Sequence, residues 1–249
     1  MVVADDSEDM RELVRASLNA YGDFEVVGEA SSGVDALALV REHEPEVLIL
    51  DLSMPGLGGL AALPALRSAA PETRIVVFSA YNKAEFGPHA ASLGAQGYGV
   101  KGMHPKALAG LVERSVSDGR PRILVVEEHW ASWAPYVNAV QAAGCDVTQA
   151  ASVKEAVALL TYRNFDLLVL GLDLRDGLGL DVLETLAVMD PQMPRPVVVT
   201  LSATGKPASF NRAFELGAVA CISTQSLNPE QLTARLAKWL EQGADLRSD

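Results

Sequence analysis

The sequence predicts an α/β fold made of two tandem doubly wound domains, each with a five-stranded parallel sheet. Two observations carry this prediction: short apolar strands alternate with helical patterns, and the same order of elements runs twice along the 249 residues. Strands that alternate with helices form parallel sheets, because right-handed crossovers bring each new strand back in the same direction. Such sheets are covered on both faces, so their strands are continuously apolar.

The first half of the chain supplies five strand–helix pairs. Residues 47–50 form the clearest strand, because four apolar residues in a row fit burial on both faces. Gly87-Pro88 falls in the fourth helical pattern, and we expect that helix to be short and to begin near Pro88, since proline suits a first turn and not a helix interior. The other expected strands are 2–3, 24–28, 74–78 and 97–100, and the other expected helices are 8–19, 34–42, 59–68 and 105–117.

The second half repeats the first at a spacing of about 120 residues, which indicates duplication of a whole domain rather than a solenoid. Leu167–Leu170 matches the strand at 47–50, and Leu216-Gly217-Ala218 matches Leu93-Gly94-Ala95. Residues 117–121 (Ser-Asp-Gly-Arg-Pro) would break regular structure between the repeats. We therefore predict a first domain at 1–118, a linker at 119–121, a second domain at 122–241 and a polar tail at 242–249.

Composition narrows the class of protein. Apolar residues make up 49% of the chain, which is ample for two cores, and the net charge of −12 with no basic stripe argues against direct nucleic-acid binding. No apolar run reaches the roughly 18 residues that a membrane helix needs, and the start does not resemble a signal peptide. Two cysteines are too few for a disulfide framework, so we expect a cytoplasmic protein without a membrane partner.

Chemistry-bearing residues of the first repeat all follow apolar strands. The carboxyl ends of parallel strands meet at one edge of the sheet, which is also where such sheets bind ligands. Three carboxylates there would repel one another unless a hard cation such as Mg²⁺ lay among them. A carboxylate beside Mg²⁺, an ammonium and a hydroxyl is equipped to attack a phosphoryl group. The residues that we expect at this edge are Asp5, Asp6, Asp51, Ser79 and Lys101.

The first repeat resembles a response-regulator receiver domain of two-component signalling, whose fold is flavodoxin-like. The matching motifs are Asp5-Asp6, residues 50–56 (Leu-Asp-Leu-Ser-Met-Pro-Gly), Ser79-Ala80 and residues 94–101 (Gly-Ala-Gln-Gly-Tyr-Gly-Val-Lys). They span essentially all of residues 1–117. The resemblance implies that a sensor histidine kinase or a histidine phosphotransfer protein donates a phosphoryl group to the chain.

The resemblance also implies a role for each matching residue. Asp51 would accept the phosphoryl group, and Asp6, Asp51 and the backbone carbonyl of Ser53 would bind Mg²⁺, with Asp5 acting through water. Ser79 and Lys101 would hold the phosphoryl oxygens. Tyr98 would be the aromatic switch that turns inward when Ser79 moves.

The second repeat resembles the same family, but its site is degenerate. Glu127-Glu128 and Ser202 are retained, whereas spacing puts Gly171 at the position of Asp51. Asp173 is a poor substitute, because it lies about 6.6 Å further along the strand. Thr224 replaces the lysine and Cys221 replaces the switch aromatic. We therefore predict a pseudo-receiver that is not phosphorylated.

These observations favour a phosphorylation-dependent signalling protein that is not an enzyme beyond its own phosphorylation and dephosphorylation. The pseudo-receiver would be an interaction or dimerisation module, so a homodimer is an expected assembly. Three alternatives stay open: the regulatory part of a longer output protein such as a diguanylate cyclase, a phosphorylation-independent scaffold, and an aspartyl phosphohydrolase. The last is disfavoured, because such enzymes usually place a second acid where Ser53 stands.

Overall fold

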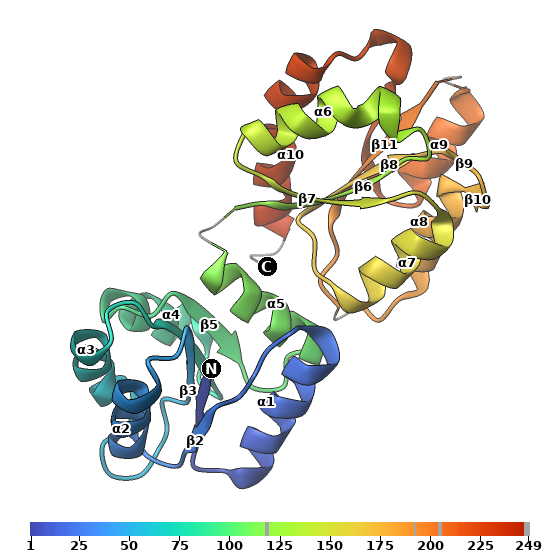
Figure 1. Cartoon of the computed structure of the whole chain (residues 1–249). Coiled ribbons are helices and arrows are strands. Elements are labelled where there is room, and N and C mark those ends of the chain that lie inside the picture. The colour runs from blue at the N-terminus through green and yellow to red at the C-terminus, as the bar shows by residue number, and fades with distance from the viewer. Residues whose placement is uncertain (118–119, 192, 204–205, 247–249) are drawn as a thin grey trace. The chain divides into compact units, whose positions relative to one another are not determined.

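The computed structural model describes residues 1–117, 120–191, 193–203 and 206–246 (Figure 1). The chain divides into two compact units, Met1–Gly119 and Arg120–Asp249. Residues 118 and 119, at the predicted domain boundary, lie outside the described residues. Within the described ranges, no helix combines the length and the apolar character that crossing a membrane requires.

The first unit is a five-stranded parallel sheet in the order β2-β1-β3-β4-β5, the doubly wound order in which the chain reverses direction across the sheet beside β1. The register pairs Val2 with both Gly28 and Leu48, and Leu50 with Val77. The strands are β1 (Val2–Ala4), β2 (Gly28–Ala30), β3 (Val47–Leu50), β4 (Arg74–Ser79) and β5 (Gly97–Val100).

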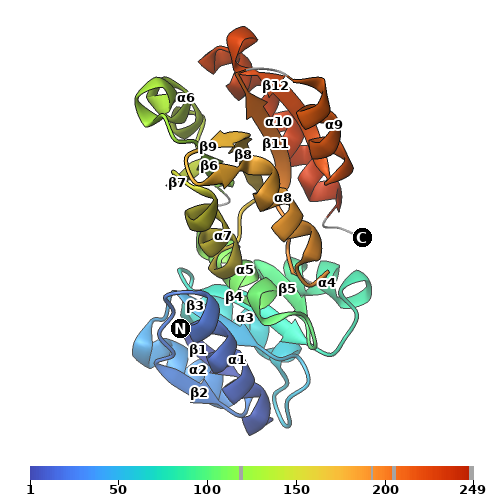
Figure 2. The same cartoon turned by 90° about the vertical axis from the view of Figure 1, so that its right-hand side faces the viewer.

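Helices cover both faces of this sheet, as Figures 1 and 2 show. Because successive strand residues point to opposite faces, Leu48 and Leu50 pack in the core beneath one helix layer and Ile49 packs beneath the other. The first layer consists of α2 (Gly33–His43), α3 (Gly59–Ala69) and α4 (Lys83–Ser92), and the second of α1 (Glu8–Tyr21) and α5 (Pro105–Val116).

Two elements differ from their predicted positions. The second strand begins at Gly28 rather than at residue 24, because Phe24 and Val26 pack against the core beneath α1 and α5 instead of entering the ladder. Helix α4 begins at Lys83 and contains Pro88 in its interior, so the start predicted near Pro88 is wrong. The side chain of Asn82 accepts a hydrogen bond from the backbone N–H of Ala84 at 2.8 Å, and this cap fixes the earlier start.

The second unit has the same sheet order, β12-β11-β8-β6-β7 when read from the opposite edge. Core clusters again lie on both faces of the sheet. The strands are β6 (Arg122–Val126), β7 (Asp146–Ala150), β8 (Leu167–Gly171), β11 (Val197–Ser202) and β12 (Ala218–Ser223). The helices are α6 (Trp130–Ala142), α7 (Val153–Tyr162), α8 (Gly179–Val188), α9 (Pro207–Glu215), the short η1 (Thr224–Ser226) and α10 (Pro229–Leu246).

One addition sets the second unit apart from the first. Between β8 and α8 the chain forms a small antiparallel hairpin, β9 (Asp173–Leu174) and β10 (Gly177–Leu178). The carboxylate of Asp176, in the turn, accepts hydrogen bonds from the backbone N–H groups of Val153 (2.8 Å) and Lys154 (3.2 Å). These bonds hold the turn against the first residues of α7 and lower the pKa of the Asp176 carboxyl.

The last helix is longer than expected. Helix α10 continues to Leu246 and so includes residues 242–246 of the predicted tail. Residues 247–249 lie outside the described part of the chain.

A glycine begins the third helix of each unit because the backbone passes very close to the preceding strand there. A Cβ atom on Gly59 would overlap the carbonyl oxygen of Asp51, and one on Gly179 would overlap the carbonyl oxygen of Gly171. Both contacts are with backbone, which cannot rotate away as a side chain can. Gly87, in α4, is unlike them: its Cβ would meet only the flexible side chain of Lys83, at 3.4 Å.

We predict that Gly59→Ala lowers the free energy of unfolding of the first unit by about 1–3 kcal/mol, because the added methyl group forces strand β3 and helix α3 apart. Gly87→Ala is the matched control and should be neutral or stabilise α4 by up to about 1 kcal/mol. Urea denaturation followed by circular dichroism measures both. Tryptophan fluorescence identifies the transition of the second unit, which holds all three tryptophans. Equal effects of the two substitutions would contradict the close-approach argument.

Candidate functional site

The expected site residues of the first unit follow directly from the sheet ladder. The backbone N–H of Asp51 donates to the carbonyl of Ala4 (2.8 Å), and that of Asp5 donates to the carbonyl of Ala30 (3.0 Å). At the other side, the N–H of Lys101 donates to the carbonyl of Ser79 (2.8 Å). These bonds extend the ladder by one rung past the strands. The backbone hydrogen bonds therefore place the side chains of Asp5, Asp51 and Lys101 at the carboxyl edge of the sheet.

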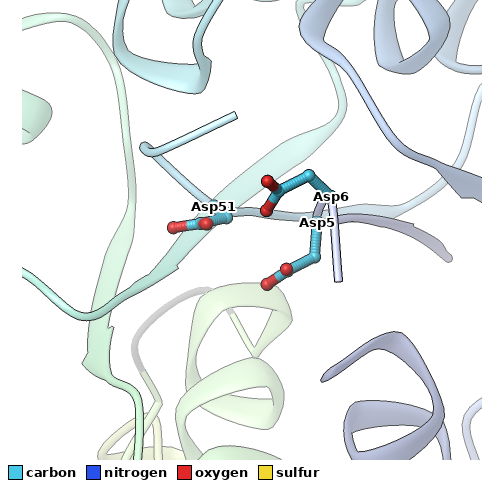
Figure 3. Close-up of side chains that lie close together, drawn as sticks. All are labelled: Asp5, Asp6 and Asp51. Atoms are coloured by element: carbon cyan, nitrogen blue, oxygen red, sulfur yellow. The ribbon is translucent and has the colours of Figure 1, made fainter. Parts of the chain in front are cut away.

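The three carboxylates of Asp5, Asp6 and Asp51 come together at this edge. Each offers an oxygen, and these oxygens lie within 4.8 Å of one another. Figure 3 shows the side chains pointing toward a common space, with Asp5 and Asp6 coming from the end of β1 and Asp51 from the end of β3. Asp5 and Asp51 are buried, at 3% and 2% exposure, and Asp6 is exposed to solvent.

Lys101 supplies the positive charge of the site. Its Nζ lies 2.7 Å from Oδ2 of Asp5 and 2.8 Å from Oδ2 of Asp51, so one ammonium bridges two buried carboxylates. Burial alone would lower the pKa of Lys101, but the hydrogen bonds to Asp5 and Asp51 outweigh burial and raise it. The lysine therefore remains charged, and the four groups together keep two uncompensated negative charges.

Asp5 is held by the chain on several sides. Its Oδ1 accepts a hydrogen bond from the N–H of Ser7 (3.0 Å), and its backbone carbonyl accepts one from Nη1 of Arg11 (2.8 Å). Its other carboxylate oxygen contacts Lys101. Asp5 is thus positioned before any ligand arrives.

Two buried polar atoms of the site have no hydrogen-bond partner among the described residues. They are Oδ1 of Asp51 and Oγ of Ser79. Leaving a buried oxygen without a hydrogen-bond partner is unfavourable by about 1–3 kcal/mol, and this free-energy cost is larger for a charged group such as the Asp51 carboxylate. This pair of atoms marks where a ligand would complete the site.

Two further residues named from the sequence lie near the site. Tyr98 is 9% exposed, and its hydroxyl donates to the carbonyl of Tyr81 at 3.1 Å. Burial and the charge of Asp51 raise the pKa of Tyr98. Tyr81 itself stacks on Phe86, with ring centroids 4.6 Å apart. Ser53 lies exposed in the loop between β3 and α3.

The sheet register gives the counterparts in the second unit. Leu50 pairs with Ala4 and Val77, and Leu170 pairs with Val126 and Thr200 in the same way. The residue after Leu50 is Asp51, and the residue after Leu170 is Gly171. Gly171 therefore holds the position of Asp51 in the sheet.

The other counterparts form a different environment. Oε2 of Glu127 lies 2.8 Å from the point where a Cβ of Gly171 would be, so this carboxylate lies over the space of the absent side chain. Thr224 follows β12 as Lys101 follows β5, and Glu128 is half-buried beside Glu127. Ser202 is 4% exposed at the end of β11. The thiol of Cys221 lies 3.0 Å from Oγ1 of Thr200 and is turned into the core.

Sequence reasoning missed two parts of this second site. The hairpin at 173–178 was not expected, although Asp176-Gly177 is a common turn dipeptide and was a usable signal. The second part is a cavity. Trp133 is 6% exposed and packs on Tyr136, and it lines this cavity together with Gly171 and Thr224. Only the folded chain brings these three residues together.

The ion pairs of the first site predict strong energetic coupling between Lys101 and Asp51. In a double-mutant cycle of Lys101→Met and Asp51→Asn, we expect a coupling free energy of about 1–3 kcal/mol, because Lys101→Met leaves the buried carboxylate of Asp51 without its cation, whereas in the Asp51→Asn background that buried charge is absent. Chemical denaturation in the presence of a metal chelator measures it. A cycle of Lys83→Met, an exposed lysine on α4, with Asp51→Asn should be additive. An additive Lys101 cycle would contradict the geometry.

Comparisons with known proteins agree with this architecture. The model of the response regulator receiver domain family matches residues 1–113 and again residues 123–237. The oxygen regulatory protein NreC of Staphylococcus epidermidis is 40% identical over 120 residues, which cover 48% of this chain and 55% of NreC. The nitrate/nitrite response regulator NarL of Escherichia coli is 39% identical over 108 residues, or 43% of this chain and 50% of NarL.

Among solved structures, a two-component response regulator of the LuxR family from Aurantimonas is 30% identical and has a TM-score of 0.45. The match covers 47% of this chain and 84% of that one. The receiver domain of AraT from Geobacillus stearothermophilus is 32% identical with a TM-score of 0.43, covering 47% and 92%. The chain spans about half the length of the curated relatives that it matches. With the family model matched in both halves, the chain belongs to the response regulator receiver domain family of two-component signal transduction, with two receiver domains in tandem.

Proposed function

We propose that the first unit is a phosphorylation switch in which Asp51 accepts a phosphoryl group from a phosphohistidine donor. The observation that carries this proposal is the buried Oδ1 of Asp51, which lacks a hydrogen-bond partner among the described residues while the second oxygen is held by Lys101 at 2.8 Å. A carboxylate held in this way presents one free oxygen in a fixed direction. Fixed orientation of a nucleophile is a principal source of rate in group transfer.

The step transfers the phosphoryl group from nitrogen to oxygen. Oδ1 of Asp51 forms the new P–O bond as the P–N bond to the donor histidine breaks, and the released imidazole takes up a proton from solvent. The ammonium of Lys101 and the hydroxyl of Ser79 stabilise charge on the phosphoryl oxygens. The unpartnered Oγ of Ser79 supports this role, because it is a donor without an acceptor.

The carboxylate cluster fits a Mg²⁺ ion. Its three oxygens lie within 4.8 Å of one another, and the site retains two uncompensated negative charges beside Lys101. Mg²⁺ is usually bound by one or two carboxylates together with waters and substrate phosphate. In this site Asp6, Asp51 and the backbone carbonyl of Ser53 would hold the ion, with Asp5 acting through water. When bound, the ion supplies charge stabilisation for the transferring group.

The second unit, in this proposal, is a pseudo-receiver that is not phosphorylated and acts as an interaction or dimerisation module. The absence of a side chain on Gly171 and the replacement of the lysine by Thr224 support this assignment. Asp173 is exposed on β9, beyond the last residue of β8, and so does not enter the strand-end position. The expected donors are a sensor histidine kinase or a histidine phosphotransfer protein.

Phosphorylation should add a single phosphoryl group per chain. We expect intact mass spectrometry, after incubation with Mg²⁺ and a small phosphodonor, to show one added group in the parent, because Asp51 is the one carboxylate of the described residues that combines an unpartnered buried oxygen with a nearby ammonium. Asp51→Asn should abolish the addition, and Asp173→Asn is the matched control that should leave it unchanged. Two added groups would contradict the pseudo-receiver assignment, and none would contradict the switch itself.

Size-exclusion chromatography of the same samples tests dimerisation. A decrease in elution volume that accompanies phosphorylation, and that is lost with Asp51→Asn, would identify dimerisation as the output. An unchanged elution volume in the fully phosphorylated chain would contradict dimerisation as the output.

Magnesium binding should depend on Asp6, although this residue is exposed. We predict that Asp6→Asn weakens Mg²⁺ binding by at least about tenfold, because the neutral amide removes one of the charges that offset the ion. Isothermal titration calorimetry of the unphosphorylated chain measures this. Asp9→Asn, an exposed change in the first turn of α1, is the control and should bind like the parent. Equal weakening in both variants would indicate a general charge effect rather than a ligand.

A further inference from the structure

The degenerate edge of the second unit contains a cavity of about 370 Å³. Its lining comes from the carboxyl ends of β8 and β11 and from the segments that follow β6, β8, β11 and β12, and the corresponding segments of the first unit carry Asp5, Asp51, Ser79 and Lys101. This volume falls within the usual range of small-molecule pockets, about 300–1,000 Å³. Every lining residue belongs to the second unit.

Two replacements account for the open space. Gly171 contributes no side chain where the first unit has Asp51, and Thr224 contributes a short one where the first unit has Lys101. In the first unit the lysine side chain crosses this space and its Nζ contacts two carboxylates, at 2.7 and 2.8 Å. At these two positions the second unit thus has neither the carboxylate of Asp51 nor the ammonium of Lys101, whose side chains fill the corresponding space in the first unit.

The charge that remains in the cavity is negative. Three lining residues carry carboxylates, Glu127, Glu128 and Asp173, and the part of the chain that the structure describes places no lysine or arginine in the lining. His129, at the exposed start of α6, is the one lining residue able to carry a positive charge. Burial raises the pKa of the Glu127 carboxyl, more than its backbone hydrogen bonds lower it. A half-buried carboxylate without a strong cation is stabilised by a cation that enters from outside.

One wall of the cavity is apolar and aromatic. Trp133 lines it and is held in place by Tyr136, at 4.6 Å between ring centroids. The indole ring and leucine side chains favour contact with an alkyl chain. The leucines that share this lining are Leu172, Leu174 and Leu201.

We propose that this cavity binds a compact organic cation, a primary alkylammonium or alkylguanidinium, whose charged head lies beside Glu127 in the place that Lys101 Nζ takes in the first unit. The alkyl part packs on Trp133 and the leucines. A metal ion fits less well, because among the described residues a group of three or more side chains close enough to share an ion occurs only at Asp5, Asp6 and Asp51. The second unit would then respond to a small molecule independently of phosphorylation.

Titration of the whole chain with matched probes tests the proposal. The probes are n-butylammonium, n-butylguanidinium, the neutral n-butanol, inorganic phosphate and Mg²⁺. We expect calorimetry to show one cation bound per chain in the second unit, with a change in tryptophan fluorescence because Trp133 lines the cavity. Butanol and phosphate should not bind. Binding of butanol as tight as that of the cations, or no binding of either cation at millimolar concentration, would overturn the proposal.

Two variants locate the site. Thr224→Lys returns a lysine to the edge and should weaken cation binding at least about tenfold, because the new ammonium occupies the same place. Glu127→Gln keeps the size of the side chain, removes its charge and should have the same effect. If circular dichroism shows that Thr224→Lys is unfolded, Glu127→Gln is the variant that tests the site. Undiminished binding in a folded Thr224→Lys chain would refute the site.

The controls separate this cavity from other acidic surfaces. Asp51→Asn removes a charge from the carboxylate cluster of the first unit and should leave cation binding unchanged. Glu184→Gln removes an exposed carboxylate of α8 that pairs with Arg212 of α9, and it should also leave cation binding unchanged. Loss of binding in Asp51→Asn would assign the cation to the first unit, and loss in Glu184→Gln would show only attraction by net charge. Either result would overturn the proposal.

Discussion

The ion pairs of Lys101 with the buried Asp5 and Asp51 determine the charge at the carboxyl edge of the first unit. Asp5 and Asp51 are almost fully buried at the end of a sheet, where carboxylates repel each other strongly in a medium of low dielectric constant. Lys101 lies 2.7 and 2.8 Å from them and offsets part of that repulsion. Because the lysine neutralises only part of the charge, the edge remains suited to a cation and to a phosphoryl group. The excess of negative charge that lowers the stability of this edge therefore also favours the binding of a cation there.

The second unit shows what the same backbone does without those ion pairs. Its sheet has the same strand order, and its third strand keeps the same register, with Leu170 paired between its two neighbouring strands as Leu50 is in the first unit. Because the side chains at the edge no longer form a lysine–carboxylate bridge, Glu127 lies over Gly171 and a cavity remains. The fold thus forms without the lysine–carboxylate bridge, since the apolar strands and helix faces supply its core.

Much of the fold could be predicted from the sequence because apolar periodicity directly reports burial. Strands such as 47–50 were expected at the bounds observed, and the duplication predicted the second sheet. Local signals failed where tertiary packing decided the outcome. Phe24 and Val26 have the composition of a strand but pack under helices, and Pro88 lies inside α4 because the Asn82 cap sets the start of that helix. The residues that gather at Asp51 were predictable from strand ends, whereas the hydrogen bonds that hold Asp5 and the cavity beside Trp133 depend on side-chain packing.

The glycines that begin α3 and α8 bear on how such chains are classified. Both are required by the close passage of helix and strand backbones, and the second is present although the neighbouring strand ends in glycine instead of aspartate. A motif search that weights this glycine therefore detects the backbone that both units share and carries no information about the side chains at the edge. The charge pair of residues 51 and 101 distinguishes the two edges, because the second unit forms the same sheet with Gly171 and Thr224 in their place. Duplicated chains of this kind are better sorted by paired charges at strand ends than by overall similarity.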